Sequence, residues 1–551
     1  MSFKHEVEKI LKRENISPEL LQSPPNPEMG DYALPCFTLA KTYKKSPDRI
    51  AQELEQKLKI NKYIKKIQAS GPYLNFFMDK GLYNKEIIEA KIKPKKKTKT
   101  TIIDFSQPNI MKPFNIAHLR STMIGNSLSK ILEYNGSKVI KVNHLGDWGT
   151  QFGKMMYAFE LWGDKKELKK DPIKYMVSLY VRFHKEAEKD PTLNDRGREW
   201  FAKLEKGDTQ ARKYWKEFRE LSLKEYKRIY KKLNITFTSW AGEAFYEPML
   251  KDTIKLLQAK GLVVESDGAL IVDLEKYGLT PCLIRKSDGS TIYATRDLAA
   301  AIYRAKNYHF DENLYVVDAR QSLHFQQIFK VLELAGFDWA KRCKHLGFGI
   351  MKFEEGVMST RKGKIILLEE VLDKSVQSVQ QIIETKNPKL KNKGKVAEQV
   401  GVGAIVFWDL SHDRTKDISF SWEKVLDFNG ETGPYVQYTH ARSASILRKA
   451  KAMKGKPDHA KLTTPAEQEL LKQLSIYQEA IEKAAEQYRP SILAKYLISL
   501  CQAFNDFYEK CPCLTEEDKA LAMARIQLVK KTKETVQEGL SLLGIEAPEE
   551  M

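Results

Sequence analysis

Short apolar runs alternate with longer segments of helical spacing through the middle of the chain. The runs are 101–105 (TIIDF), 137–146 (SKVIKVNHLG), 269–274 (ALIVDL), 313–319 (NLYVVDA) and one that ends at 351 (HLGFGIM). Such alternation predicts βαβ units and a parallel sheet. A charged stretch from about 152 to 234 has helical spacing throughout, and we interpret it as an insertion in the α/β domain.

The two ends of the chain have different patterns. Residues 1–90 combine helical spacing, the turn MGDYALP and the strand-like GPYLNFFM, which predicts a small α+β domain. The basic segment 91–100 carries six lysines and a proline, so we interpret it as a linker. We assign 101–370 to the α/β domain and 371–408 to a connecting segment. Helical spacing dominates 409–551 and predicts an all-α C-terminal domain.

The segment NIMKPFNIAHLRSTMIG, Asn109 to Gly125, lies between a predicted strand and a predicted helix. Free N–H groups at a helix start attract phosphate. Asn115 and His118 would share a helix face, with Ser121 and Thr122 one turn further, and all four could donate hydrogen bonds to a triphosphate. An ordinary buried helix start with a satisfied histidine is an equally good interpretation of this segment alone.

A second candidate segment is GVMSTRKGK, Gly356 to Lys364, which combines glycines, hydroxyls and three cations. Such a loop could close over a pyrophosphate and offset its charge. Taken alone it is weak evidence, because most short basic loops are only solvated.

Charge and cysteine usage narrow the class of protein. The net charge is +20, from 92 Lys and Arg against 72 Asp and Glu, which favours a polyanionic partner such as nucleic acid. Genome composition alone could also produce a lysine-rich surface. The six cysteines form no paired metal-ligand spacing, so we expect reduced thiols, no structural metal and a cytoplasmic location. No apolar run is long enough for a membrane span.

The two candidate segments together resemble the signatures of class I aminoacyl-tRNA synthetases. The HIGH signature falls on Asn115-Ile116-Ala117-His118, and the KMSKS signature falls on Val357-Met358-Ser359-Thr360-Arg361. VNHLGDWGTQFG, IYATRDLAAAIYR, MSTRKGK and TGPYVQYTHAR resemble the arginyl-tRNA synthetase family, and the likeness covers essentially the whole chain. Two departures stand in the first signature, where Asn115 replaces a histidine and Ala117 replaces a glycine.

The resemblance implies a fold and a two-step reaction. The fold is a Rossmann-type nucleotide-binding catalytic domain with a helical insertion, a helical anticodon-binding domain and an additional N-terminal domain that contacts tRNA. In the reaction, arginine attacks the α-phosphate of ATP, and the 2′-OH of the terminal tRNA adenosine then takes the arginyl group. ATP with Mg²⁺, L-arginine and tRNA(Arg) are the implied partners. We expect a monomer.

Site residues follow from the same resemblance. The implied ATP-binding residues are Asn115, Ala117, His118, Met358, Ser359 and Thr360. The implied catalytic residues are His118, Asn115, Arg361 and Lys362, and we add Lys112, which could supply positive charge missing from the first signature. The implied arginine-binding residues are Asn109, Glu243, Tyr293, Asp297 and Gln321. Tyr508 and Met551 are implied to contact tRNA. Without the resemblance, each of the five arginine-binding residues would be interpreted as part of a surface helix face or as a polar loop residue.

Three other functions compete with arginine activation. The departures at Asn115 and Ala117 would suit a catalytically silent tRNA-binding relative, although the remaining site residues are all present. A related synthetase for another cationic amino acid, lysine above all, would also use paired carboxylates. A plain nucleic-acid-binding protein would not need a nucleotide site.

Overall fold

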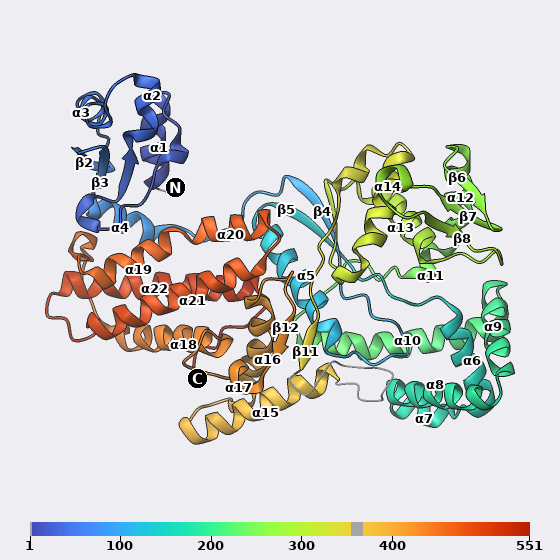
Figure 1. Ribbon diagram of the computed structural model, residues 1–551. Helices are drawn as coiled ribbons and strands as arrows, with labels where there is room; N and C mark the ends of the chain where they lie inside the picture. The colour runs from blue at the N-terminus through green and yellow to red at the C-terminus, as the bar shows by residue number, and fades with distance from the viewer. Residues whose placement is uncertain (1–2, 354–366) are drawn as a thin grey trace. The chain divides into compact units, whose positions relative to one another are not determined.

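A four-stranded parallel sheet in the order β10–β9–β4–β5 forms the centre of the α/β part of the chain (Figure 1). The strands are β4 (Lys99–Asp104), β5 (Ser137–Val142), β9 (Glu312–Tyr315) and β10 (Cys343–His345). Helix α5 (Ala117–Tyr134) connects β4 to β5 and approaches the sheet closely, because a Cβ at Gly125 would lie 2.2 Å from the Phe105 ring. This computed structural model describes residues 3–353 and 367–551.

The apolar runs at 101–105, 137–146 and 313–319 form strands of this parallel sheet, as predicted. The prediction is wrong for 269–274. Strand β7 (Ala269–Val272) lies between β6 (Val263–Ser266) and β8 (Cys282–Arg285) in a separate antiparallel sheet. The cause is the two-residue turn Asp267–Gly268, in which both residues have positive φ (51° and 74°), because so short a connection permits only a hairpin.

The run that ends at 351 supplies two strands. Its first residue, His345, ends β10, and its last residue begins β11 (Met351–Phe353), which pairs in parallel with β12 (Ile418–Phe420). The other helices of this region are α11 (Glu243–Tyr246), α12 (Leu250–Ala259), α13 (Tyr293–Tyr308), α14 (Ser322–Leu334), α15 (Leu368–Lys386), α16 (Lys393–Ser411) and α17 (Trp422–Val425). One apolar core includes Leu257, Leu298 and Val331 from α12, α13 and α14, together with Ile284 of β8.

Five consecutive helices lie between β5 and α11. They are α6 (Thr150–Trp162), α7 (Lys165–Lys170), α8 (Pro172–Lys189), α9 (Thr192–Glu205) and α10 (Thr209–Lys232). Asp164, Asp171 and Asp208 cap the starts of α7, α8 and α10 by accepting backbone N–H groups. Phe159 packs against the α10 rings of Tyr214 and Phe218 with centroids 5.2 and 5.4 Å apart, so α10 is anchored on α6.

The chain divides into two units, of which one holds residues 1–92, 439–478 and 499–536. Within it, the N-terminal segment forms α1 (Phe3–Arg13), α2 (Ala40–Tyr43), α3 (Pro47–Lys57), α4 (Lys80–Glu89) and the antiparallel sheet β1 (Tyr32–Pro35), β3 (Tyr73–Met78), β2 (Ile64–Ser70). The buried Asn84 of α4 donates to the carbonyls of His459 and Leu462. These bonds attach the N-terminal segment to the helical segment of the same unit.

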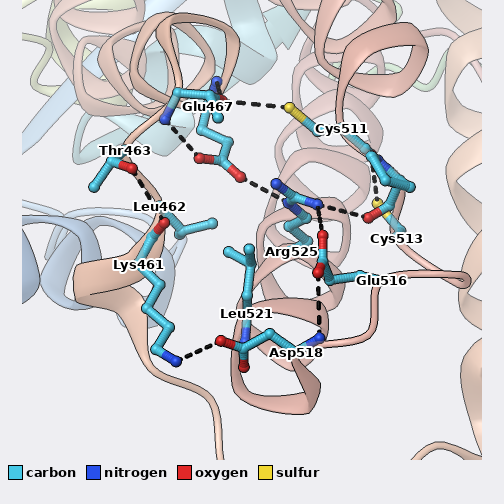
Figure 2. A network of polar contacts seen from close by, with 12 residues as sticks. Lys461, Leu462, Thr463, Glu467, Cys511, Cys513, Glu516, Asp518, Leu521 and Arg525 are labelled. Atoms are coloured by element: carbon cyan, nitrogen blue, oxygen red, sulfur yellow. Dashed lines mark hydrogen bonds and ion pairs between the residues drawn. The ribbon is translucent and has the colours of Figure 1, made fainter.

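The C-terminal helices are α18 (Gly433–Lys449), α19 (Pro465–Ser475), α20 (Tyr477–Glu486), α21 (Pro490–Lys510) and α22 (Lys519–Leu542), as the helical spacing predicted. Figure 2 shows the polar network that holds the loop between α21 and α22. Arg525 donates to Glu467 at 2.7 Å, to Glu516 at 2.6 Å and to the Pro512 carbonyl at 2.8 Å. Burial raises the pKa of the adjacent Cys513 thiol to about 12, which makes it unreactive.

All six cysteines are free and buried. Across 3–353 and 367–551, no helix combines the length and the apolar character needed to cross a bilayer.

Candidate active site

The turn after β4 has a strained backbone that helix α10 holds in place. Ser106, Gln107 and Met111 all have positive φ, of 77°, 49° and 63°, in a region that side chains other than glycine rarely adopt. Such turns at the carboxyl ends of parallel strands are where α/β folds bind ligands.

One face of α10 supplies the hydrogen bonds that fix this turn. Ser222, Tyr226 and Tyr230 are spaced four residues apart. The Ser222 hydroxyl accepts from the N–H of Met111 at 2.9 Å, and the Tyr226 hydroxyl donates toward the carbonyls of Asn109 and Lys112. The Tyr230 hydroxyl lies 2.6 Å from that of Ser106. The strained conformation is therefore determined by tertiary contacts.

His118 lies at the start of α5 as a neutral hydrogen-bond donor. The N–H of Asn115 donates to its Nδ1 at 3.2 Å, which leaves the proton on Nε2. Burial lowers the pKa of His118 to about 4, and the charge of Lys112 acts in the same direction. At neutral pH the imidazole can thus donate from Nε2 without carrying a charge.

Asn115 is oriented by the helix start itself. Its Oδ1 accepts from the N–H of Ala117 at 3.1 Å, so its Nδ2 remains the group able to donate to a ligand. The side chain of Ala117 is exposed. Lys112 reaches solvent from the same turn, although partial burial lowers the pKa of its ammonium.

The expectation that Ser121 and Thr122 donate to phosphate is wrong. Both are buried and already bonded: Ser121 donates to the Val316 carbonyl at 2.7 Å, and Thr122 donates to the His118 carbonyl at 2.6 Å. Ser121 also accepts from the N–H of Ser106 at 2.9 Å. These hydroxyls attach α5 to the strands and to the turn.

The second signature lies outside the described residues, and with it Met358, Ser359, Thr360, Arg361 and Lys362. The residues that follow it are described, and they meet the first signature. Leu367 pairs with Asn115 in an antiparallel bridge, and the N–H of Leu368 donates to the Phe114 carbonyl at 3.0 Å. The Phe114 ring in turn packs against His118, with centroids 5.0 Å apart.

Tyr293 and Asp297 form a side-chain cluster with a histidine that the sequence did not reveal. They lie one turn apart on α13, and His324 of α14 contacts both. His324 Nε2 lies 2.6 Å from Asp297 Oδ2, and its ring lies 4.9 Å from the exposed Tyr293 ring. Burial opposes ionisation of Asp297, but the His324 hydrogen bond and the charges of His324, His144 and Arg304 prevail and lower its pKa.

Glu243 is the second carboxylate, and the HLGDWG loop holds it. Its N–H donates to the Leu145 carbonyl at 3.0 Å, and the next N–H, of Ala244, donates to Asp147 Oδ1 at 2.9 Å. Burial raises the pKa of Glu243 to about 7, with the negative charges of Asp297 and Asp147 contributing and Arg296 opposing. The interaction with Asp297 couples the two carboxylates electrostatically.

Asn109 connects the strained turn to the loop that holds Glu243. It pairs with Gly146, where a Cβ would lie 1.9 Å from Asn109 Oδ1, so only glycine fits at 146. Gln321 is exposed at the start of α14, three residues before His324.

A buried ion pair acts electrostatically on Asp297, and sequence reasoning also missed it. Arg304 contacts Asp104 Oδ2 at 2.6 Å, and both are about 1–3% exposed. Arg304 follows Asp297 by seven residues and therefore shares its helix face; that spacing was the only signal in the sequence. In the described ranges, no group of three or more His, Cys, Asp or Glu side chains is arranged to hold a metal ion.

The two expected tRNA contacts have different surroundings. Tyr508 of α21 is 44% exposed, and the Arg442 guanidinium lies 5.0 Å from its ring centroid. Met551 is partly buried against the core formed by α15 and α16, and its carbonyl accepts from Asn387 at 3.0 Å.

Family comparisons cover the whole chain. Residues 78–422 match the model for the class I (R) tRNA synthetase catalytic domain, 436–551 match the DALR anticodon binding domain, and 1–78 match the arginyl tRNA synthetase N terminal domain. The arginine–tRNA ligase of Alkaliphilus metalliredigens is 48% identical over 99% of this chain and 98% of its own length. That of Clostridioides difficile is 47% identical over 100% and 98%.

A solved structure agrees with these matches. Arginyl-tRNA synthetase of Thermus thermophilus is 28% identical, with a TM-score of 0.85 over 100% of this chain and 99% of that one. The parallel sheet with its signature turn, followed by a helical anticodon-binding domain, defines a class I aminoacyl-tRNA synthetase. Within that class, the chain belongs to the arginyl-tRNA synthetase family.

Proposed function

We propose that the chain activates L-arginine with ATP and transfers it to the 2′-OH of the terminal adenosine of tRNA(Arg). One observation supports the proposal: the Glu243 carboxylate interacts with that of Asp297, and the loop that holds Glu243 contacts the strained turn of the first signature. Asn109 and Gly146 connect the two. A carboxylate pocket beside a phosphate-type turn fits a cationic amino acid that reacts with a nucleotide.

Adenylate formation joins an arginine carboxylate oxygen to the α-phosphorus of ATP and breaks the bond from that phosphorus to the bridging oxygen of pyrophosphate. Such a reaction depends on positioning and charge neutralisation. The neutral His118 supports it by donating from Nε2 to a phosphate oxygen, and Asn115 by donating from Nδ2. Arg361 and Lys362 would neutralise the leaving pyrophosphate, as their place in the second signature implies. Met358, Ser359 and Thr360 would line the nucleotide beside the exposed Ala117.

Arginine recognition follows from the geometry of a planar, permanently charged guanidinium. Two carboxylates can accept its forked N–H groups, and an aromatic ring can stack on its face. Asp297, kept ionised by His324, and Glu243 would supply the carboxylates, and the exposed Tyr293 the ring. Gln321 would add a polar contact, and Asn109 would bind the α-amino or carboxylate end. A lysine ammonium would use the paired oxygens and the ring less well.

In the second step, the 2′-OH of the terminal tRNA adenosine would attack the carbonyl carbon of the arginyl-adenylate, and AMP would leave.

The tRNA would be bound by the positively charged surface of the protein and by stacking of unpaired bases. We assign Tyr508, with the Arg442 guanidinium beside its ring, to a stacking contact with an unpaired base. We keep Met551 as a second contact.

Magnesium would accompany the ATP phosphates and neutralise their charge. The free, buried cysteines suit a reducing compartment, so we assign the enzyme to the cytoplasm, and we expect a monomer.

Arginine-dependent ATP–pyrophosphate exchange, with and without tRNA(Arg), tests the proposal. We expect exchange with arginine and none with lysine, and the resemblance implies that tRNA is required. Tight tRNA binding without exchange under either condition would instead identify a non-catalytic relative, and Asn115 and Ala117 would explain the loss.

The first prediction concerns the replacement of Lys112. Its ammonium lies in the signature turn and acts electrostatically on His118. Lys112→Ala should lower kcat/KM for ATP by about 100- to 1,000-fold, the usual range for one lost electrostatic contact to the transition state. Lys112→Arg should retain most activity, and Lys255→Ala, which removes an exposed lysine of α12, should change nothing. Unchanged exchange by Lys112→Ala would remove Lys112 from the catalytic residues.

A further inference from the structure

The polar face of α10 carries an ion-pair cluster with α15. Arg228 and Lys232 lie four residues apart on α10, and Glu369 and Asp373 lie four apart on α15. Arg228 contacts both carboxylate oxygens of Glu369, with 2.6 Å between Nη2 and Oε2. Lys232 Nζ lies 2.9 Å from Glu369 and 2.9 Å from Asp373. The last helix of the insertion is thus joined to α15 by two pairs of opposite charge.

The residues at the start of α15 contact the first signature. Leu367 pairs with Asn115, and Leu368 donates to the Phe114 carbonyl. Glu369 is the next residue, in the first turn of α15. Any displacement of α15 relative to α10 would therefore disturb the pairing of Leu367 with Asn115 in the first signature.

Helix α10 also contacts the strained turn after β4, which belongs to the proposed nucleotide site. On the face toward the strained turn, Ser222, Tyr226 and Tyr230 bond residues 106–112. The Phe114 ring packs on Tyr226 and Tyr230 with centroids 5.7 and 5.4 Å apart. Helix α10 thus contacts the turn after β4 through hydroxyls and rings, and α15 through charges.

The contacts of α10 with the turn and its contacts with α15 differ in their exposure to solvent. The hydroxyl contacts are buried, whereas the side chains of Arg228, Lys232, Glu369 and Asp373 are 46%, 29%, 28% and 50% exposed. Ion pairs this exposed add little to global stability. They can, however, set the distance between two helices that are folded for other reasons.

We propose that the cluster of Arg228, Lys232, Glu369 and Asp373 positions α15 on α10, so that Leu367 and Leu368 stay paired with the first signature and keep its helix start in place for reaction with ATP. The four residues touch no substrate and are positioning residues. The inference rests on the proposed function, and it makes the helical insertion a determinant of ATP use.

The test compares Glu369→Gln, Arg228→Gln and their double variant with the wild-type chain in ATP–pyrophosphate exchange with tRNA(Arg). Each single change should raise the KM for ATP by roughly 3- to 30-fold, the range of couplings through packed elements. The KM for arginine should stay within about twofold, because the arginine pocket is built on α11, α13 and α14. The double variant should be no worse than the stronger single one, since both remove the same contact.

Two controls separate positioning from a loss of folding. Arg228→Lys keeps the positive charge but loses the forked guanidinium. Its KM for ATP should lie between those of Arg228→Gln and the wild type. Glu333→Gln breaks the Lys330–Glu333 pair of α14, with 2.8 Å between the charged atoms and similar exposure, and should leave both KM values unchanged. The melting temperature should be the same for all variants.

The outcomes are distinguishable. A wild-type chain without exchange would refute the proposed function itself. With an active wild type, an unchanged KM for ATP in Glu369→Gln would overturn the positioning role. A fall in kcat alone, with a lower melting temperature, would also overturn it, because that result indicates only a smaller folded fraction.

Discussion

Two carboxylates in one pocket have opposite pKa shifts because their neighbours differ. Asp297 has a histidine partner at 2.6 Å, and this contact with the neighbouring positive charges lowers its pKa despite burial. Glu243 is buried near other carboxylates, and its pKa rises to about 7. Near neutral pH, Asp297 is therefore ionised while Glu243 is only partly so, and a bound guanidinium would favour the ionised form of Glu243.

Arginine binding should consequently depend on pH through Glu243. Below about pH 7 a proton competes with the guanidinium, so the KM for arginine should rise as pH falls, by up to about tenfold per unit. Glu243→Gln should raise the KM at pH 8 and flatten the profile. Glu205→Gln alters a carboxyl whose pKa burial also raises, but on α9, and should keep the wild-type profile. Profiles measured by pyrophosphate exchange would contradict the assignment if Glu243→Gln retained the slope.

The site was predictable where its residues are close in sequence. The four-residue spacing of Tyr293 and Asp297 predicted their shared face, and the structure has them on one helix. His324 follows Asp297 by 27 residues on another helix, so no local pattern could connect them. Ser121 and Thr122 were wrongly predicted to bind phosphate. Spacing alone cannot distinguish a hydroxyl that faces a ligand from one that is buried and already bonded within the protein.

At the scale of elements, a buried ion pair joins α5 to α16. Arg120 Nε lies 3.0 Å from Asp409 Oδ1, and Arg120 also donates to the carbonyls of Gly349 and Lys416, which flank β11 and β12. Both charged side chains are about 0–1% exposed. The pair fixes the signature helix to the segments that lead into β11 and β12, which lie on either side of the second signature in the sequence.

Removing one partner of this pair should cost far more than removing both. Arg120→Met leaves a buried carboxylate and should destabilise the fold by about 3–5 kcal/mol, whereas Arg120→Met with Asp409→Leu should recover most of that loss. The midpoint of the first urea transition is the appropriate measure, because a chain of this size unfolds in several steps. Arg196→Met, which breaks an exposed pair on α9, is the control and should shift the midpoint little. Equal losses for the single and double variants would contradict this account.

The sequence predicted whether a segment forms a strand or a helix better than it predicted which other element that segment contacts. Apolar runs identified β4, β5 and β9, and helical spacing identified α6 to α10. Residues 269–274 have the same apolar character, yet the Asp267–Gly268 turn sends them into a hairpin. Turn chemistry, rather than hydrophobicity, decided the partner. The α10 contacts with the strained turn were hidden because tyrosines at helical spacing predict only a core face.

At the scale of the whole molecule, the net charge of +20 and the exposed Tyr508 should contribute to tRNA affinity in separable ways. Phosphate contacts release counterions, so the logarithm of the affinity should fall linearly with the logarithm of salt concentration. Stacking lacks that dependence. Tyr508→Ala should weaken tRNA(Arg) binding by about 1–3 kcal/mol at every salt concentration and leave the slope unchanged.

A matched aromatic control and the slope itself make this test decisive. Tyr277→Ala removes another exposed tyrosine with lysines over its ring, on the segment between β7 and β8, and should leave tRNA affinity unchanged. Replacing a lysine that contacts phosphate should instead reduce the slope by about 0.7–0.9. Filter binding from about 50 to 200 mM salt covers the range in which these effects diverge. If Tyr508→Ala changed the slope but not the affinity at high salt, its ring would be supporting the neighbouring Arg442 charge, and base stacking at this position would be excluded.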